Sequence, residues 1–360
     1  MKELREILRR IDKLEPQENA ILATVVDVKG SSYRLPGARM LILENGESYG
    51  TVSGGCLEAD VMERAKDVLA NGNTQIFVYD TTKNEDSVFS FNMGCRGVIR
   101  ILLEPIQDNP FIQFMRLCFE KERGVAATSI SSTKGGVIGD RVFFVGDGVD
   151  QNEFVDKRIR DHAVEVLKSD VSRIEEYEFG EVFFEYIAPP VNIKIFGAGA
   201  DAVPLAKIAK NLGWHTTVIN HRTALANNER FEKPDKIIIS RPENIAKEVS
   251  LTSDSVAVVM THNYDHDKTI LESLFKSDLK YIGLLGPKVR TENILRELKE
   301  KGVEISDKNL EMLHGPVGLD TGAHLPETIA LSILAEIQAV LTGRNGGFLK
   351  NREESIYGRD

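Results

Sequence analysis

The chain has 360 residues, of which 42% are hydrophobic and 28% charged, and it carries a formal net charge of -10 with a pI of about 5.4. This length indicates two or three domains, and the composition is that of a chain that buries complete cores. The acidic balance argues against a general nucleic-acid-binding protein and against binding to an anionic membrane surface, because both need basic faces. No apolar stretch approaches the ~20 residues of a membrane span.

The N-terminus and the three cysteines indicate a cytoplasmic protein. The first 14 residues lack the apolar core of a signal peptide, and their apolar residues recur at helical spacing instead. We therefore expect an amphipathic helix here, no export, and reduced thiols.

After this helix the chain is rich in strand patterns, interrupted by one helix. Asn45-Gly46 is a strong hairpin signal, and Asn71-Gly72 ends the helix. The elements are predicted, in chain order, at Ala20–Val28, Arg39–Leu43, Leu57–Ala70 (the helix), Thr74–Tyr79 and Val98–Leu103.

Residues 110–188 mix helix and strand patterns, and Pro189-Pro190 forms a stiff link to the second half of the chain. The predicted elements are helices at Phe111–Lys121 and Asn152–Lys168 and strands at Val125–Ile130, Arg141–Val145 and Glu181–Ile187.

From Val191 onward strands alternate with helices, which is typical of a parallel sheet covered by helices on both faces. The strands are predicted at Asn192–Phe196, Thr216–Asn220, Lys236–Ser240, Ser255–Met260 and Lys280–Leu285. The helices are predicted at Ala200–Asn211, Asp267–Phe275, Lys288–Lys299 and Pro326–Leu341. We therefore predict an α/β protein with an N-terminal α+β domain followed by a Rossmann-like, doubly wound parallel sheet. The expected divisions are 1–109, a mixed α/β extension or linker region at 110–188, the Rossmann-like domain at 189–345 and a C-terminal tail at 346–360.

The segment Val191–Ala202 ends a strand pattern in G-x-G-x-x-A, the phosphate-binding turn of dinucleotide folds. Gly197 allows the tight turn, Gly199 lets the backbone approach a pyrophosphate, and Ala202 lets helix and sheet pack closely. This turn leaves open whether the ligand is a nicotinamide dinucleotide, another nucleotide-like molecule, or absent.

Polar residues follow two later strands, at the edge where open α/β sheets bind ligands. Where a carboxylate would favour NAD, the chain has Asn220, which can still bond a hydroxyl, and Arg222, which can meet a phosphate. His262 is either an acid–base group, a metal ligand or a solvated residue. For His266 we favour a solvated residue, with Asp265 or Asp267 capping the next helix.

The loop G-S-S-Y-R-L-P-G-A-R presents two hydroxyls and two arginines, a composition that suits a phosphate or, alternatively, a solvated hairpin loop. The residues concerned are Ser31, Ser32, Arg34 and Arg39.

The segment S-G-G-C-L-E places Cys56, preceded by Gly54 and Gly55, where a loop enters a helix. Unpaired N–H groups there would favour the thiolate, so we predict a functional role for this cysteine. Cys95, also among glycines, is left open between function and packing, and Cys118 is interpreted as a buried apolar residue. No Cys/His spacing supports a protein-ligated zinc site.

These motifs resemble the xanthine dehydrogenase accessory protein family of the XdhC/CoxI type. In the first half the resemblance rests on G-S-S-Y-R-L-P-G-A-R-M, G-T-V-S-G-G-C-L-E-A-D-V and G-C-R-G. In the second half it rests on I-F-G-A-G-A-D-A, V-V-M-T-H-N-Y-D-H-D, Y-I-G-L-L-G-P-K and G-P-V-G-L-D-T-G-A-H-L-P-E-T-I-A. The chain departs from the family at Arg96, Ala200 and Asn220, where members often have Gly, His and Asp.

The resemblance implies a maturation factor rather than the dehydrogenase itself. It implies a homodimer that binds molybdenum cofactor (molybdopterin), protects it while it gains its terminal sulfur, and delivers it to xanthine dehydrogenase or a related molybdenum hydroxylase of purine metabolism. Cys56 is the residue that it assigns to the cofactor, as a molybdenum or sulfur contact. A cysteine desulfurase is a further partner that this role implies.

Two other functions stay open. The glycine turn and His262 are also compatible with an NAD(P)-dependent oxidoreductase component of the xanthine dehydrogenase system. The acidic charge balance and the absence of a catalytic triad are compatible with a non-catalytic assembly scaffold, and no residue is assigned a catalytic role.

Overall fold

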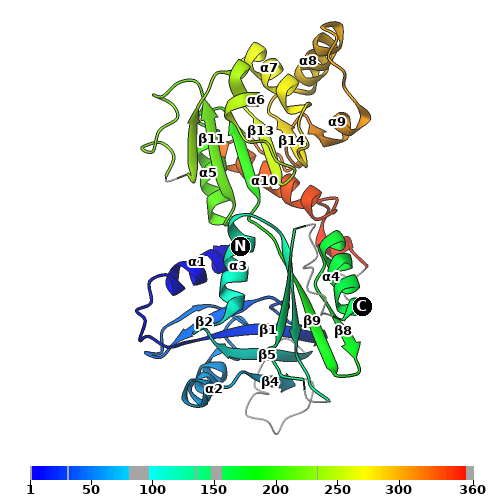
Figure 1. Ribbon diagram of the computed structural model, residues 1–360. Helices are drawn as coiled ribbons and strands as arrows, with labels where there is room; N and C mark the ends of the chain where they lie inside the picture. Colours follow the sequence, from blue (N-terminus) through cyan, green and yellow to red (C-terminus); the bar gives the residue numbers. More distant parts are fainter. Residues whose placement is uncertain are drawn as a thin grey trace. The chain divides into compact units, whose positions relative to one another are not determined.

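The structure is a computed structural model that describes residues 2–30, 32–80, 97–133, 136–146, 156–232 and 234–353. The chain divides into two compact units, Met1–Pro189 and Pro190–Asp360, each with its own sheets and cores (Figure 1). The division lies between the two consecutive prolines. Among the described residues, no helix is long and apolar enough to cross a membrane.

The first sheet of the N-terminal unit is antiparallel, with the strand order β3-β2-β1-β5-β4. The strands are β1 (Ala20–Gly30), β2 (Arg39–Leu43), β3 (Ser48–Gly50), β4 (Gln75–Asp80) and β5 (Gly97–Pro105). Leu22 of β1 packs with α1 (Lys2–Ile11). Its neighbours Ile21 and Ala23 point to the other face, toward α2 (Glu58–Asn71). Figure 1 shows the two helices on opposite sides of this sheet, which explains why β1 is apolar almost throughout.

The described residues between 110 and 188 form a second antiparallel sheet in the same unit, with the strand order β7-β6-β9-β8. Its elements are α3 (Pro110–Glu120), β6 (Gly124–Ser129), β7 (Arg141–Val145), α4 (Lys157–Ser169), β8 (Arg173–Tyr177) and β9 (Gly180–Ile187). The helix predicted at Asn152–Lys168 begins at Lys157, and residues 147–155 lie outside the described part. The sequence R-I-E-E-Y does not alternate clearly, so β8 was not predicted, and its pairing with β9 makes it a strand.

Buried ion pairs join the two sheets of the N-terminal unit. Arg39 on β2 donates to both carboxylate oxygens of Glu185 on β9 at 2.5 Å, and the two side chains are 7% and 6% exposed. Arg141 on β7 binds Glu104 on β5 at 2.5 and 2.7 Å. Removing one partner of such a pair leaves an uncompensated buried charge. These contacts therefore bind the stretch after residue 110 firmly to the first sheet.

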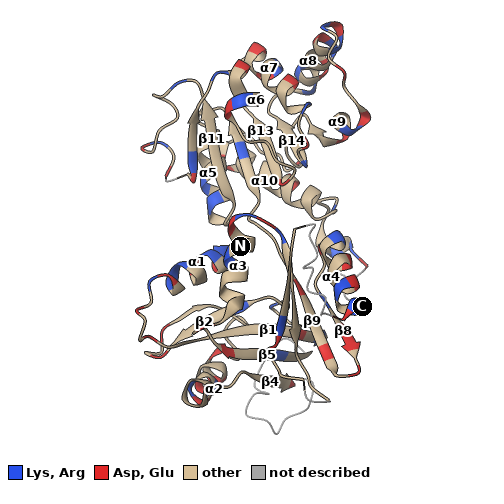
Figure 2. Cartoon of the chain, in the orientation of Figure 1, with Lys and Arg blue, Asp and Glu red and all other residues tan. Residues whose placement is uncertain are grey.

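The C-terminal unit is a doubly wound parallel sheet, as predicted, with the strand order β12-β11-β10-β13-β14-β15. The strands are β10 (Asn192–Phe196), β11 (His215–Asn220), β12 (Lys236–Ile239), β13 (Ser255–Val259), β14 (Tyr281–Leu284) and β15 (Leu313–His314). Numbered by their place in this unit, they follow the order 3-2-1-4-5-6 of dinucleotide-binding folds. The strands are mostly uncharged in Figure 2, as both faces of a buried parallel sheet require.

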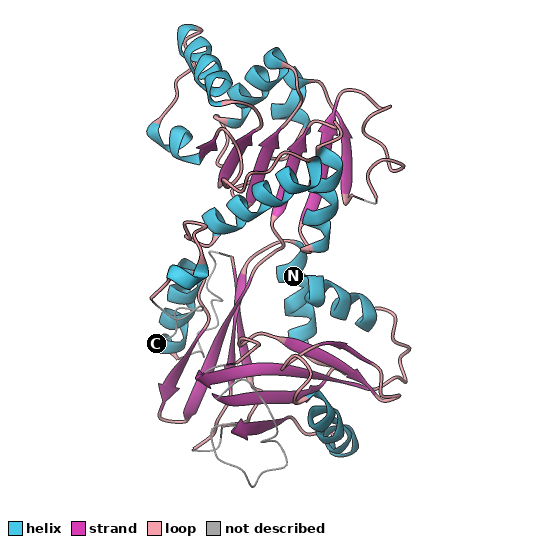
Figure 3. Cartoon of the chain, turned by 180° about the vertical axis from the view of Figure 1, so that it is seen from behind, coloured by secondary structure: helices cyan, strands magenta, loops and turns pink. Residues whose placement is uncertain are grey.

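Two layers of helices cover this sheet. On one face α5 (Ala202–Asn211) and α10 (Pro326–Leu341) share a core, and Figure 3 shows a helical layer in front of the strands. On the other face lie α7 (Tyr264–Leu274) and α8 (Lys288–Glu300). The remaining short elements showed no periodicity in the sequence: η1 (Pro242–Asn244), α6 (Ile245–Glu248), α9 (Asp307–Met312) and η2 (Leu349–Asn351).

Candidate functional site

A single carboxylate organises the S-G-G-C loop of the N-terminal unit. Glu58, the first residue of α2, accepts hydrogen bonds at Oε1 from the backbone N–H groups of Ser53 at 2.9 Å and Gly54 at 3.1 Å. Its Oε2 accepts the N–H of Gly55 at 2.8 Å and the hydroxyl of Ser53. The hydroxyl of Thr51 donates to the same carboxylate. The loop therefore wraps around an anion that belongs to the protein itself.

This environment keeps Glu58 ionised. Burial raises the pKa of its carboxyl group, but hydrogen bonds from Ser53 and Thr51 outweigh burial and lower the pKa to about 2. The hydroxyl of Ser53 also accepts the N–H of Leu57 at 2.8 Å, so it links the loop to the helix entrance. Most of the N–H groups of the loop are thus hydrogen-bonded to Glu58 or to the Ser53 hydroxyl.

Cys56 is an exposed free thiol directly after the two glycines. We expected unpaired N–H groups at the helix entrance to favour its thiolate, but the N–H groups of Gly54 and Gly55 are donated to Glu58. That part of the expectation is wrong, because these groups stabilise a carboxylate instead. The loop therefore places the thiol at the surface, on a turn whose N–H groups are hydrogen-bonded to Glu58.

Tyr33 links the loop G-S-S-Y-R-L-P-G-A-R to the S-G-G-C loop. A side-chain carbon added to Gly54 would lie 2.6 Å from Cδ1 of the Tyr33 ring, so the ring lies directly against this glycine. The tyrosine is nevertheless 68% exposed. A side-chain carbon added to Gly55 would meet nothing within 4 Å. The two loops therefore meet at an aromatic ring beside open space, and we had not predicted Tyr33 as a site residue.

The predicted anion ligands of the first loop have different surroundings. The half-buried Arg34 donates to Glu3 of α1 at 2.5 Å, and its backbone N–H donates to Oγ of Ser32 at 3.3 Å. Arg39 is buried, and its guanidinium binds Glu185 in the link between the sheets. We therefore correct the assignment of Arg39 from a phosphate ligand to a structural residue, because its charge is already compensated inside the unit.

Two further predicted residues, Ser31 and Cys95, lie outside the described part of the chain. Cys118 is buried, as predicted, and burial raises the pKa of its thiol to about 12. Within the ranges that the structure describes, no group of three or more His, Cys, Asp or Glu residues is arranged to hold a metal ion.

In the C-terminal unit the glycine turn packs closely on the neighbouring strand. Gly197 has a φ of 129°, and a side-chain carbon there would lie 2.3 Å from the carbonyl oxygen of Met260. Ala202 begins α5 and is fully buried. Gly197 thus has the steric need for a glycine that the motif predicts, and the burial of Ala202 agrees with the predicted close packing of helix and sheet.

His262 covers the remaining glycine of the turn. A side-chain carbon added to Gly199 would lie 3.2 Å from both Cδ2 and Nε2 of His262. His262 has a φ of 59°, and its Nε2 lies 3.3 Å from Oδ2 of Asp201. An imidazole with a carboxylate partner therefore lies over the surface that this motif offers to a pyrophosphate.

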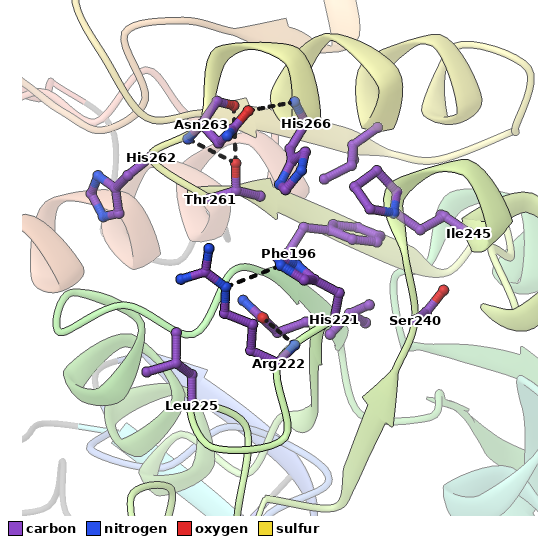
Figure 4. Close-up of a pocket in the computed structure, with 14 residues that line it drawn as sticks. Phe196, His221, Arg222, Leu225, Ser240, Ile245, Thr261, His262, Asn263 and His266 are labelled. Carbon is purple, nitrogen blue, oxygen red and sulfur yellow. Dashed lines mark hydrogen bonds between the residues drawn. The ribbon is translucent and has the colours of Figure 1, made fainter.

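Asn220 and Arg222 line a cavity of about 240 Å³ at the carboxyl ends of the strands. Figure 4 shows Arg222 there with its neighbour His221. Oδ1 of Asn220 accepts the backbone N–H of Arg222 at 2.8 Å. Nε of Arg222 donates to Nε2 of His221 at 3.1 Å, the contact dashed in Figure 4. His262 also lines this cavity, so the structure brings these three predicted residues together.

Two histidines that we did not assign to a site complete the rim. His266, in the first turn of α7, lies with its ring centroid 5.0 Å from that of His221, at an interplanar angle of 86°. Burial lowers the pKa of His221, and the neighbouring His266 and Arg222 lower it further. Helix α7 is capped by Asn263, whose side chain accepts the N–H of His266 at 3.0 Å, and not by an aspartate as expected. Both histidines closely follow strands at the ligand-binding edge, which was the signal in the sequence.

Comparison with known proteins assigns both units. The profile described as the XdhC Rossmann domain matches residues 193–337, and the profile described as the XdhC and CoxI family matches residues 14–80. A Bacillus subtilis (strain 168) protein, named as a probable subunit of xanthine dehydrogenase, is 34% identical over 333 residues, which are 90% of this chain and 94% of the relative. The chain belongs to the XdhC and CoxI family. The resemblance found in the sequence motifs is thereby confirmed.

Two further proteins are similar to this member of the XdhC and CoxI family over almost its whole length. The molybdenum cofactor insertion chaperone PaoD of Escherichia coli (strain K12) is 23% identical over 342 residues, covering 93% of this chain and 88% of PaoD. A crystal structure from Bacillus halodurans, described as a xanthine dehydrogenase, has a TM-score of 0.77 and 30% identity, and covers 99% of both chains. The fold of both units is therefore that of a solved relative.

Proposed function

We propose that the protein is an accessory factor that holds molybdenum cofactor for insertion into xanthine dehydrogenase or a related molybdenum hydroxylase. Its family supports this role, as do the names of two relatives, one a probable subunit of xanthine dehydrogenase and the other a molybdenum cofactor insertion chaperone. The observation on which the proposal depends is the exposed thiol of Cys56, held on a turn that Glu58 stabilises. A thiolate is a soft ligand that suits molybdenum or sulfur.

The surroundings of Cys56 fit a flat cofactor that bears a phosphate. The exposed ring of Tyr33 offers a stacking face, and Gly55 adds no side chain that would block access to the thiol. Ser32 and Arg34 lie on the same loop as Tyr33, and the donors for a phosphate are the Ser32 hydroxyl and those N–H groups of Arg34 that are not donated to Glu3. In this proposal the cofactor is cargo, and the residues of the two loops bind it and orient it.

The test is to express the protein in cells that make the cofactor, purify it, and measure bound molybdenum and molybdopterin. We expect cofactor on the wild-type protein and at least a tenfold loss in Cys56→Ala. Cys118→Ala removes a thiol far from solvent and is the matched control, with folding of both variants checked by circular dichroism. Equal cofactor content in wild type and Cys56→Ala would exclude the role of the thiol.

The aromatic contact has a separate test. Tyr33→Phe keeps the ring and is expected to retain the cofactor, whereas Tyr33→Ala is expected to lose a large part of it. Because the side chain is 68% exposed, neither change should affect folding. A Tyr33→Ala variant that binds as much cofactor as wild type would show that the ring is not part of the site.

The proposal also covers partners. We propose that the protein acts as a homodimer and contacts a hydroxylase subunit when loaded with cofactor. A cysteine desulfurase is the proposed partner that supplies the terminal sulfur while the protein holds the cofactor. Light scattering would measure whether the particle has about twice the chain mass of 40.1 kDa. Co-purification of a hydroxylase subunit with a protein that never contains cofactor would instead favour the scaffold alternative.

The oxidoreductase alternative is supported by the strand order of the C-terminal unit. It is weakened by His262, the acid–base residue it would use, because this side chain lies over Gly199 and beside Asp201. Fluorescence titration with NADH and NADPH separates the two functions. If neither dinucleotide shows saturable binding, this alternative is excluded.

A further inference from the structure

The cavity of the C-terminal unit has an apolar floor and a polar rim that carries one arginine. The floor is formed by Phe196, Ile219, Pro242, Ile245 and Ile270. The rim carries His221, Arg222 and His266, and no carboxylate occurs among the described residues that line the cavity. Figure 4 shows the rim side chains of His221 and Arg222 together, with the Phe196 ring beside them. An apolar surface next to a guanidinium and two imidazoles suits a ligand that combines a flat base with a phosphate.

The end of β11 is built for a phosphate rather than a ribose hydroxyl. In dinucleotide folds a carboxylate at this position binds the 2′-OH, and a nearby arginine accommodates a 2′-phosphate. Here the position holds the neutral Asn220, whose Oδ1 already accepts the N–H of Arg222. The Arg222 side chain is anchored through Nε to His221, and its Nη atoms make no hydrogen bond to the described part of the protein. Those two nitrogens are therefore available for the bidentate contact that guanidinium groups make with phosphate.

The imidazole of His262 lies across the approach to the glycine turn. His262 lies over Gly199, and the carboxylate of Asp201 lies 3.3 Å from its Nε2. A pyrophosphate at the turn would have to displace this imidazole and would then meet the negative charge of Asp201. The nucleotide that fits without rearrangement is one whose phosphate lies at the arginine end.

The size of the cavity agrees with a small ligand. Pockets for drug-sized ligands have volumes of about 300–1,000 Å³, and this cavity has about 240 Å³. One nucleoside with one phosphate outside its rim matches this space better than a complete dinucleotide.

We infer that this cavity binds a nucleoside phosphate through a 2′-phosphate held by Arg222 and His221, with the base on the apolar floor. This binding site goes beyond the proposed cofactor role, because it lies in the other unit and requires neither Cys56 nor molybdenum cofactor. Its presence or absence leaves the test of Cys56 unchanged.

The test is calorimetric titration of the full chain with adenosine 2′-monophosphate, adenosine 5′-monophosphate, adenosine and inorganic phosphate. We expect saturable binding of the 2′-phosphate at least tenfold tighter than that of the other three, because only it places a phosphate at Arg222 while the base occupies the floor. Arg222→Ala should weaken this binding at least tenfold. Arg344→Ala removes an equal charge from an exposed position outside the cavity lining and should change nothing.

Several outcomes would overturn the inference. It fails if the 2′-phosphate does not bind, if the 5′-phosphate binds equally well or better, or if Arg222→Ala binds as wild type does. Inorganic phosphate that binds as tightly as the nucleotide would show that the apolar floor plays no part. Since Arg222 is exposed, loss of binding in its variant cannot be attributed to failure to fold, and circular dichroism checks this point.

Discussion

Ser53 donates both its backbone N–H, at 2.9 Å, and its hydroxyl to the carboxylate of Glu58. This relationship turns the S-G-G-C-L-E segment into one physical unit, in which the acidic residue after the cysteine shapes the loop before it. The two glycines are needed at the same place, because their φ angles are 86° and 116°. The position of Cys56 therefore depends on the hydrogen bonds that Glu58 makes with the residues before the cysteine.

We predict that Glu58→Ala lowers both stability and cofactor binding, although the thiol of Cys56 itself is retained. The N–H groups of Ser53 and Gly55 lose their acceptor, and that of Gly54 keeps only the Thr51 hydroxyl, which should cost about 1–3 kcal/mol of unfolding free energy. Denaturant unfolding and molybdopterin content measure the two effects. Glu63→Ala is the control on the same helix, because Glu63 makes only an exposed ion pair with Lys66. Full cofactor content in Glu58→Ala would mean that the loop needs no such support.

We predict that Glu58 makes stability depend on pH at the acid end. Its pKa is about 2 in the folded protein against an ordinary value of 4.5, so the unfolded chain binds the proton more tightly. The stabilisation is therefore complete above pH 4.5 and is lost as the pH falls toward 2. The measurement is the difference in unfolding free energy between wild type and Glu58→Gln, which should shrink across this interval. A difference that stays constant between pH 5 and pH 2 would contradict the low pKa.

We predict that the buried pair between Arg39 and Glu185 is needed to hold the two sheets of the N-terminal unit together. Glu185→Gln leaves a buried guanidinium without its counter-charge and should cost about 3–5 kcal/mol in denaturant unfolding of the unit. Replacing both residues, Arg39→Met with Glu185→Leu, should recover most of this loss. Lys66→Ala, in an exposed pair, should cost less than about 1 kcal/mol. A small effect of Glu185→Gln would show that the pair is not essential for packing.

We predict that Gly197→Ala destabilises the C-terminal unit far more than Gly302→Ala does. Both glycines have a positive φ, 129° and 86°. Only at Gly197 would the new carbon meet backbone, 2.3 Å from the carbonyl oxygen of Met260, whereas Gly302 has nothing within 4 Å. We expect about 1 kcal/mol for Gly302→Ala and about 3 kcal/mol or more for Gly197→Ala, measured by thermal unfolding. If both variants lose similar stability, the positive φ alone explains the loss and the contact with Met260 contributes nothing.

Much of the fold follows from local pattern. The bounds predicted for β2, β7, β10 and α10 agree with the structure, because apolar alternation, a helical period and Pro or Gly at the ends are all visible within a short window. Strand β8 and helix α9 were missed, since the first depends on pairing with β9 and the second is a single short helix. Elements of this kind are decided by their neighbours rather than by their own residues.

The candidate sites also combine features that the motifs predict with features that depend on tertiary contacts. The motifs identified Cys56, Gly197 and Arg222 as residues of interest, because residue type and spacing indicate their chemistry. The motifs did not indicate that Glu58 takes the N–H groups assigned to the thiol, or that Arg39 is buried against Glu185. In both cases the partner is set by a contact that residue type alone does not reveal.

By itself, then, the sequence determined the family, the parallel C-terminal sheet and the location of the two N-terminal loops, since these depend on periodicity and short motifs. Only the tertiary structure decided which groups are free to meet a ligand. It placed Tyr33 against Gly54 and His262 over Gly199, and it left the Nη atoms of Arg222 without a hydrogen bond to the described part of the protein. The physical reason is that a hydrogen-bond donor or a charged group pairs with the partner that the folded structure places beside it, and such partners are often distant in the chain.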